Sequence, residues 1–153
     1  LSYIIVVVYI KLIVIFIGYK FMLNITRKVE YALIALRHMQ SKNDIGLTSA
    51  KEIAAQYGIP KQLLAKTLQQ MSREGIVKAV HGPTGGYKIA ANLKKISLKD
   101  FFEKLEGPLG MMDCYFDSEC VQISNCNIRV PIQRINNNMR DMFSQMTLQE
   151  ITQ

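Results

Sequence analysis

The chain has 153 residues, enough for one compact domain or for a small domain with an oligomerising extension, and it can bury a substantial core. Its net charge of +7 is unevenly placed: residues 22–95 carry 12 Lys and Arg against 4 Asp and Glu (+8), residues 96–153 carry 5 against 8 (−3), and residues 1–21 add +2. A basic half joined to an acidic half favours a polyanion-binding surface on the first, although charge alone fits a solvated basic face equally well. Three cysteines exclude an intrachain disulfide framework that uses every thiol.

Residues 1–21 are almost wholly apolar, with Lys11 near the centre, and resemble a membrane span or a signal sequence. A central lysine costs about 2.5 to 3.5 kcal/mol on insertion scales, and no small-residue cleavage site follows. Met22 opens a segment of ordinary soluble composition. We therefore interpret residues 1–21 as an upstream translated extension, with a membrane anchor as the alternative, and expect a cytoplasmic protein.

The next segment predicts a helix over residues 25–40, because its apolar residues recur with a helical period. Glu30, Ile34 and His38 follow one another at intervals of four residues, so they line a different face from the main apolar stripe.

Residues 48–77 predict two short helices joined by a tight turn. Ser49 and Glu52 form an S-x-x-E capping box at the start of the first helix, and Gly58 closes it. Pro60 suits the first turn of the second helix, which Gly75 ends. This arrangement is typical of a helix-turn-helix.

A β-hairpin is expected immediately afterwards, because two β-prone runs flank the turn "HGPTGG" at residues 81–86. Helix-turn-helix plus hairpin predicts a winged helix-turn-helix DNA-binding domain over residues 22–95. Taken singly, the wing segment is better explained as a tight turn and each lysine as a solubilising residue, but the order of elements and the +8 balance together favour DNA. The expected contacts to double-stranded DNA come from the second helix, the wing and the start of the first helix: Lys61, Gln62, Lys66, Lys78, His81, Gly82, Thr84, Gly85, Lys88, Arg27 and Lys28.

Residues 96–153 predict a short amphipathic helix, a cysteine loop and a long helix. The long helix carries apolar residues at 4-3-4-3-4 spacing, with Asn136, Asn137, Arg140 and Asp141 outside the seam: Ile128, Ile132, Ile135, Met139, Met142 and Met146. We interpret this seam as a homodimerisation helix, with packing on its own domain as the alternative. The expected fold class is therefore mainly α with a small β-hairpin wing (α+β).

The cysteine loop places Cys114, Cys120 and Cys126 within thirteen residues of a polar segment. Thiolates are soft ligands that suit iron–sulfur clusters and zinc, and either centre normally takes four protein ligands. A catalytic thiol is less well supported, because neither His38 nor His81 lies in a recognisable nucleophile motif.

The order of these features resembles the Rrf-two family of winged-helix transcription regulators, over nearly all of residues 22–153. The matching segments are "ITRKVEYALIAL", "KEIAAQYGIPKQLLAKTLQQMSREGIV", "HGPTGGYKIA", the three cysteines and "MTLQEI". Two positions depart from the family pattern: His81 replaces the arginine that usually precedes the wing Gly-Pro, and Arg129 replaces a histidine ligand that some members have.

The resemblance implies that Cys114, Cys120 and Cys126 hold an iron–sulfur cluster, 4Fe-4S in preference to 2Fe-2S. Its nitric-oxide-sensitive members supply a carboxylate from the partner subunit, and the matching position is Glu30; His38 is the reserve ligand. We therefore expect a homodimeric DNA-binding repressor that senses nitric oxide, redox state or iron–sulfur supply, with no small-molecule substrate. A zinc or thiol redox switch, a small electron-transfer protein and a membrane-tethered regulator are the alternatives.

Overall fold

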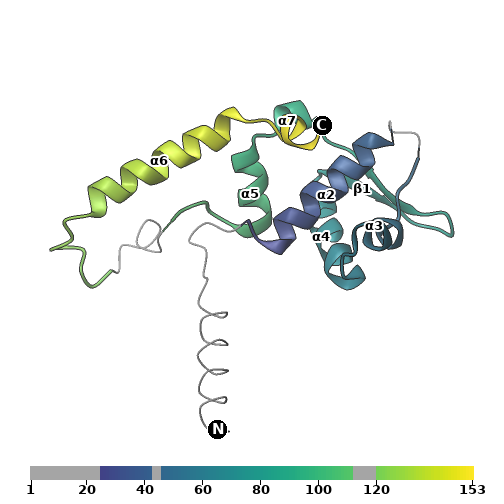
Figure 1. The fold of residues 1–153 in the computed structure, drawn as a ribbon, viewed down its shortest axis with the longest axis horizontal. Coiled ribbons are helices and arrows are strands. Elements are labelled where there is room, and N and C mark those ends of the chain that lie inside the picture. Colours follow the sequence, from purple (N-terminus) through teal and green to yellow (C-terminus); the bar gives the residue numbers. More distant parts are fainter. Residues whose placement is uncertain (1–24, 43–45, 112–119) are drawn as a thin grey trace, which may run out of the picture.

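The computed structural model describes residues 25–42, 46–111 and 120–153, so the predictions for residues 1–21 and for Cys114 lie outside its described parts. Figure 1 shows a helical body on one side and one long helix that extends from it as an arm. Along the chain the elements are α2 (Arg27–Ser41), α3 (Ala50–Tyr57), α4 (Lys61–Arg73), β1 (Val77–Val80), β2 (Gly86–Ile89), the 3-10 helix η1 (Leu93–Lys95), α5 (Leu98–Glu106), α6 (Arg129–Gln145) and α7 (Leu148–Thr152).

The helix-turn-helix is confirmed, with small differences at its ends. Gly58 has a left-handed backbone (φ 64°) and closes α3, whereas Pro60 is the N-cap of α4 rather than a residue of its first turn. Ser49 accepts the expected hydrogen bond from the Glu52 amide at 3.1 Å. The Glu52 carboxylate contacts Lys42 and His38 instead. Only the Ser49 side-chain half of the predicted capping box therefore forms.

The core lies where α2, α3, α4 and α5 meet. Its largest fully buried apolar side chains come from every helix of the body, from the residue before β1 and from the C-terminal α7: Leu36, Ile53, Leu64, Leu68, Met71, Phe101, Ile76 and Leu148. The apolar positions of α5 are all buried, as its amphipathic pattern predicts.

The wing is an antiparallel hairpin in which Val77 pairs with Ile89 and Val80 pairs with Gly86. Thr48, just before α3, adds a bridge to the hairpin: the Thr48 amide donates to the Tyr87 carbonyl at 3.0 Å, and the Tyr87 amide donates back at 2.8 Å. Gly85 has no room for a side chain, because a Cβ there would collide with the carbonyl oxygens of Val80 and Gly82. The wing is therefore fixed both at its tip and against the helix-turn-helix.

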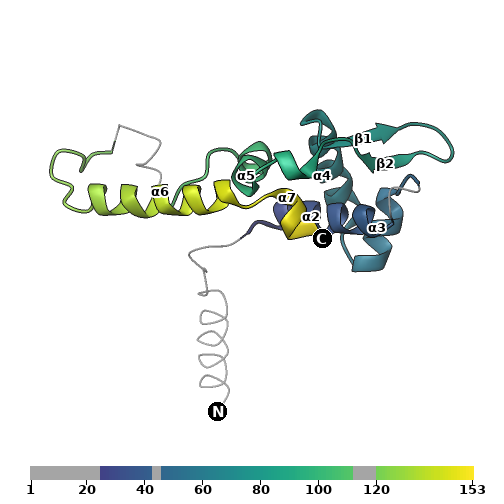
Figure 2. The ribbon, with the colours of Figure 1, turned by 90° about the horizontal axis from the view of Figure 1, so that it is seen from above.

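The arm is α6, and its C-terminal end is fastened to the body. The Leu98 amide donates to the Met146 carbonyl and the Leu148 amide to the Ile96 carbonyl, each at 2.8 Å. A complete capping box between Thr147 and Glu150 then starts α7, which packs against α2. Figure 2 shows the same arm from above, with α7 returning to the body.

The apolar seam of α6 is divided between two environments. Ile128, Ile135 and Met142 are 51%, 48% and 51% exposed, whereas Ile132, Met139 and Met146 are partly buried. Of α6, which is described over its whole length, only Asn136 is buried, although the heptad pattern placed it outside the seam. The reason is a contact with a distant residue: the Asn136 side-chain oxygen accepts a hydrogen bond from the Met111 amide at 2.9 Å, so this polar face packs against its own chain. None of the helices in the described ranges is long and apolar enough to cross a membrane.

Candidate nucleic-acid interface and cysteine loop

The exposed start of α4 carries three of the predicted DNA contacts. Leu64, Leu68 and Met71 bury one face of this helix in the core. Lys61, Gln62 and Lys66 are exposed, and Gln62 and Lys66, one turn apart, share the outer side of the helix. A helix presented in this way has the geometry that enters a DNA major groove.

Beside these residues, a basic groove of about 360 Å³ runs between α2 and α4. Four cationic side chains line it: Arg27, Lys28, Lys66 and Arg73. The hydrogen bond to Glu30, at 2.6 Å, raises the pKa of Arg27 above its ordinary value. Arg73 was not predicted from the sequence as part of a DNA-binding surface. Its position seven residues after Lys66, on the same side of α4, is a signal that could have indicated it.

Lys28 has partners inside the protein. Its ammonium group donates to the Leu105 carbonyl at 2.9 Å and lies 3.3 Å from a Glu106 carboxylate oxygen. This lysine therefore joins the end of α5 to the start of α2, in addition to lining the basic groove.

The wing presents its charges at the sides and its small residues at the tip. Lys78 and Lys88 are directly opposite one another in the hairpin, and both are exposed. His81, Gly82 and Thr84 are exposed at the tip, while Gly85 is partly buried. Opposed like charges destabilise an isolated hairpin, so their pairing here is consistent with an anionic partner.

Two of the three cysteines lie in the described part of the loop. Cys120 and Cys126 are free and partly buried. The Ile123 amide donates to the Cys120 carbonyl at 3.0 Å, and the Asn125 amide donates to the Gln122 carbonyl at the same distance. These turns hold both cysteines before α6, at the tip of the arm (Figure 1). Among the residues that the structure describes, no group of three His, Cys, Asp or Glu side chains could hold a metal ion, and Cys114 lies outside that set.

Glu30 lies in the body, on α2, whereas the two described cysteines lie just before α6, in the arm. It is in the first turn of α2, its side chain is 41% exposed, and its Oε2 contacts Arg27 at 2.6 Å. Figures 1 and 2 both show α2 within the body and residues 120–128 at the free end of the arm. The structure does not bring Glu30 and these cysteines together within one chain.

His38 is a packing residue between α2 and α3, which argues against its role as reserve ligand. Its side chain is 3% exposed, and its Nδ1 lies 3.2 Å from the Tyr57 hydroxyl. Its Nε2 lies 3.5 Å from Glu52. A hydrogen bond from Lys42 lowers the pKa of Glu52, and the neighbouring His38 side chain acts in the same direction.

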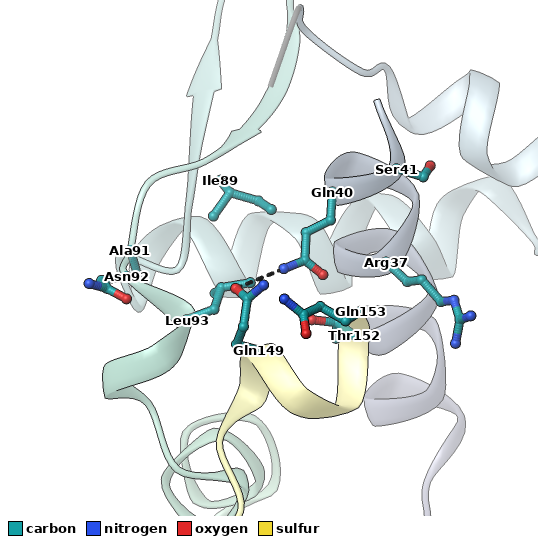
Figure 3. Close-up of a pocket in the computed structure, with 10 residues that line it drawn as sticks. All are labelled: Arg37, Gln40, Ser41, Ile89, Ala91, Asn92, Leu93, Gln149, Thr152 and Gln153. Atoms are coloured by element: carbon teal, nitrogen blue, oxygen red, sulfur yellow. Dashed lines mark hydrogen bonds between the residues drawn. The ribbon is translucent and has the colours of Figure 1, made fainter. Parts of the chain in front are cut away.

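A polar depression of about 780 Å³ lies where α2, the end of β2, η1 and α7 meet (Figure 3). The Gln40 amide donates to the Gln149 side-chain oxygen at 3.0 Å across it, and Arg37 points away from it. No cysteine, histidine or carboxylate side chain is among its described lining residues, so it offers neither an acid–base pair nor soft metal ligands. The helix-turn-helix and the cysteine loop are therefore the stronger functional sites.

Known proteins share this arrangement. The Rrf2 (Rrf-two) family, described as iron-dependent transcriptional regulators, matches residues 25–153. An HTH-type transcriptional regulator of Aquifex aeolicus is 29% identical over 126 residues, which cover 80% of this chain and 87% of that protein.

Two solved structures show the same fold. CymR (YrzC), the global cysteine regulator of B. subtilis, has a TM-score of 0.66 at 24% identity, over 85% of this chain and 96% of that one. IscR of T. potens has a TM-score of 0.64 at 23% identity, over 84% of this chain and 85% of that one. The winged helix, the family match over residues 25–153 and these likenesses agree. The chain thus belongs to the Rrf2 family of winged-helix transcriptional regulators, whose members act on DNA and are not enzymes.

Proposed function

We propose that this regulator binds operator DNA as a homodimer and that an iron–sulfur cluster controls its DNA affinity. The cluster ligands are Cys114, Cys120 and Cys126 of one subunit and Glu30 of the partner subunit. The observation that carries the proposal is the pair of free, partly buried thiols at the tip of the arm in a chain whose family is described as iron-dependent. A 4Fe-4S cluster is favoured over 2Fe-2S.

The residues present fit such a group in their chemistry. Thiolates are the usual ligands of iron–sulfur clusters, and both described thiols are free rather than paired in a disulfide. Arg27 contacts Glu30 through Oε2, so ligation through Oε1 is compatible with that ion pair. When bound, the cluster would supply a centre that reacts with nitric oxide or changes its oxidation state.

A second subunit explains how Glu30 and the cysteines would meet. The arm carries the thiols away from the body of its own chain, and Ile128, Ile135 and Met142 stay about half exposed along it. An exposed apolar row of this spacing is buried when a partner helix packs against it. In a symmetric dimer each arm would then reach the body of the other subunit.

DNA recognition is assigned to the outer face of α4 and to the wing. Lys61, Gln62 and Lys66 read or position the major groove, while the wing residues contact the flanking backbone or minor groove. A dimer presents two such helices, and its affinity depends on their separation because half-sites lie at a fixed spacing. The link between the arm and the body therefore makes DNA binding responsive to the loop.

The sensing function is tested on protein purified without oxygen. We expect iron and sulfide in defined ratio, a visible absorption spectrum, and a change of at least tenfold in operator affinity after nitric oxide treatment. Colourless protein without iron, or the same DNA affinity before and after cluster loss, would refute it.

The role of Glu30 is tested by Glu30→Ala, with Asp141→Ala as the matched control at an exposed carboxylate on α6. Removing a ligand should make the cluster decay several-fold faster in air and shift its absorption spectrum, because one iron loses its protein ligand. Asp141→Ala should leave both unchanged. Equal decay and identical spectra in the two variants would exclude Glu30 as a ligand.

A second candidate keeps DNA binding but uses the cysteines as a zinc or thiol redox switch. It is favoured by the state of Cys120 and Cys126, which are free and partly accessible, and thiols of that kind can bind zinc or be oxidised. Metal analysis distinguishes the candidates: zinc at one equivalent per chain, or no metal with reversible thiol oxidation, supports the switch.

A further inference from the structure

The C-terminal end of α5 is capped by side chains of other helices. Helix α5 ends at Glu106, and the last carbonyl groups of a helix have no partners within it. The Gln70 side-chain amide, from α4, donates to the carbonyl oxygens of Lys104 and Leu105, both at 3.0 Å. Lys28 of α2 donates to the same Leu105 carbonyl at 2.9 Å. The DNA-reading helix is therefore bonded directly to the end of α5.

The other side of α5 is bonded to the arm. The Arg140 guanidinium donates to Glu103 Oε1 at 2.6 Å and to the Leu109 carbonyl at 2.9 Å. Glu103 also accepts a hydrogen bond from the Leu109 amide at 3.3 Å. Arg140 and Glu103 are 24% and 25% exposed, so this ion pair is partly shielded from water.

The same face of α6 holds the start of the cysteine loop. Asn136 is fully buried and accepts a hydrogen bond from the Met111 amide. Met111 is the last described residue before residues 112–119, which include Cys114. Residues 109 and 111 are thus both attached to the arm, one turn apart along α6.

We propose that these contacts form a relay that transmits the state of the cysteine loop to α4. We name as the α5 relay Gln70, Glu103 and Arg140 together with the carbonyl groups of Leu105 and Leu109. The role of the α5 relay in regulation rests on the function proposed above. The structural coupling of α6 to α4 through α5 does not depend on that function. Gln70 and Arg140 are positioning residues, because their side-chain hydrogen bonds go to α5 and to the Leu109 carbonyl.

The geometry explains why a displacement would reach the DNA-reading surface. Helix α5 has nine residues and is anchored by its buried Phe101 and Leu105, so it moves as a rigid unit. Lys66 lies one helical turn before Gln70, so a tilt of α4 about the Gln70 contact moves Lys66 relative to the groove. The other polar link between the helices, Lys104 with Glu74 at 3.1 Å, is exposed and weak.

Hydrogen exchange of the reduced, metal-free full chain tests the coupling without DNA or cluster. We expect Arg140→Met to speed amide exchange in residues 61–73 at least threefold, and to add nothing further in a chain that already carries Gln70→Met. This loss of additivity is the signature of coupled positions. Arg134→Met on the same helix and Gln69→Met on α4 are the matched controls, since both side chains are exposed and lie outside the relay.

Two results would overturn the relay. The first is faster exchange after Arg140→Met that stays within residues 107–111 and leaves α4 unchanged; the second is strictly additive effects of the two substitutions. If Arg140→Met does not fold, Arg140→Lys keeps the positive charge but loses the two-point contact, and the same criteria apply with a smaller expected change.

DNA affinity provides the regulatory readout. The ratio of operator affinities with and without the cluster should fall to within twofold of one in Gln70→Met, while Gln69→Met keeps the wild-type ratio even if both affinities change. A wild-type ratio equal to one would refute the proposed sensing function, and hydrogen exchange would still decide the relay. A wild-type ratio that survives Gln70→Met would refute the relay alone.

Discussion

The body and the arm of this regulator obtain their stability in different ways. In the body, α2 to α5 surround a core of fully buried apolar side chains. Along the arm, Asn136 is the one buried residue of α6, and Ile128, Ile135 and Met142 remain about half exposed. A buried core can fold within one chain, whereas an exposed apolar row gains its stability from a partner. The body therefore contains what one chain needs to fold, and the exposed row on the arm is the surface that the proposed dimer would bury.

The largest effect is expected from a cavity in the body. Leu68 of α4 is fully buried, so Leu68→Ala should lower the free energy of unfolding by about 2 to 5 kcal/mol. Urea denaturation followed by circular dichroism measures this, with Leu63→Ala, 49% exposed on the same helix, as the control. Equal losses in the two variants would contradict the assignment of the core.

A charge in the arm should disrupt assembly and leave the body intact. Ile135→Lys removes an apolar side chain from both copies of a symmetric interface, so the dimer dissociation constant should rise about 100-fold or more. Sedimentation equilibrium measures the constant, and the helical signal of the monomer should persist. A dimer unaffected by Ile135→Lys, in comparison with Arg134→Ala, would place the interface elsewhere.

A moderate effect on DNA binding is expected within the body. Lys66 is exposed on α4 and lines the basic groove. Lys66→Ala should weaken binding at all sequences and reduce the slope of log affinity against log salt by about 1, because one phosphate contact is lost. Fluorescence anisotropy at several salt concentrations measures the slope, and Lys51→Ala on the exposed side of α3 should leave it unchanged.

The smallest effect concerns the junction between the two regions. Burial acts to raise the pKa of Glu103, but the Leu109 amide, Arg140 and Lys99 together outweigh it, so its pKa lies below the ordinary value of 4.5. A carboxyl with a lowered pKa in the folded protein stabilises it fully above pH 4.5, and this contribution is lost as the pH falls through the folded-state value.

Unfolding experiments between pH 7 and pH 3 measure this contribution. Glu103→Gln should remain less stable than the wild type at pH 7 and lose less stability on acidification, by about 1 kcal/mol or less. Asp141→Asn serves as the exposed control. Parallel curves for Glu103→Gln and the wild type would show that this ion pair does not contribute.

Much of the body could be predicted from the sequence because its signals are local. Helical periodicity, the Gly58 turn and the wing glycines each lie within a few residues of the structure that they specify, and α5 buries the apolar residues that its pattern selects. The exposure of Lys61 and Lys66 followed from their place at the start of α4, while their contact with DNA stays a prediction.

The remaining features depend on contacts between distant residues. Lys28 bonds to Leu105 and Gln70 to Lys104, across 77 and 34 positions, and no local pattern indicates either pair. The burial of Asn136 likewise depends on Met111, 25 residues away, which is why a heptad pattern assigned it to the outside. The ligand set of the cysteine loop stays a prediction, because Cys114 lies outside the described residues.

The return of the chain through α7 affects how a movement of the arm reaches the body. Paired backbone hydrogen bonds between Ile96–Leu98 and Met146–Leu148 fasten the near end of α6, and α7 clamps that fastening to α2. Because the base of the arm is rigidly attached, a displacement of its tip rotates the body as well. A flexible hinge at the base would let the arm move without the body. A displacement of the tip is therefore transmitted to the whole winged helix, and removal of α7 should loosen this attachment although Arg140 still joins α6 to Glu103 and to the Leu109 carbonyl.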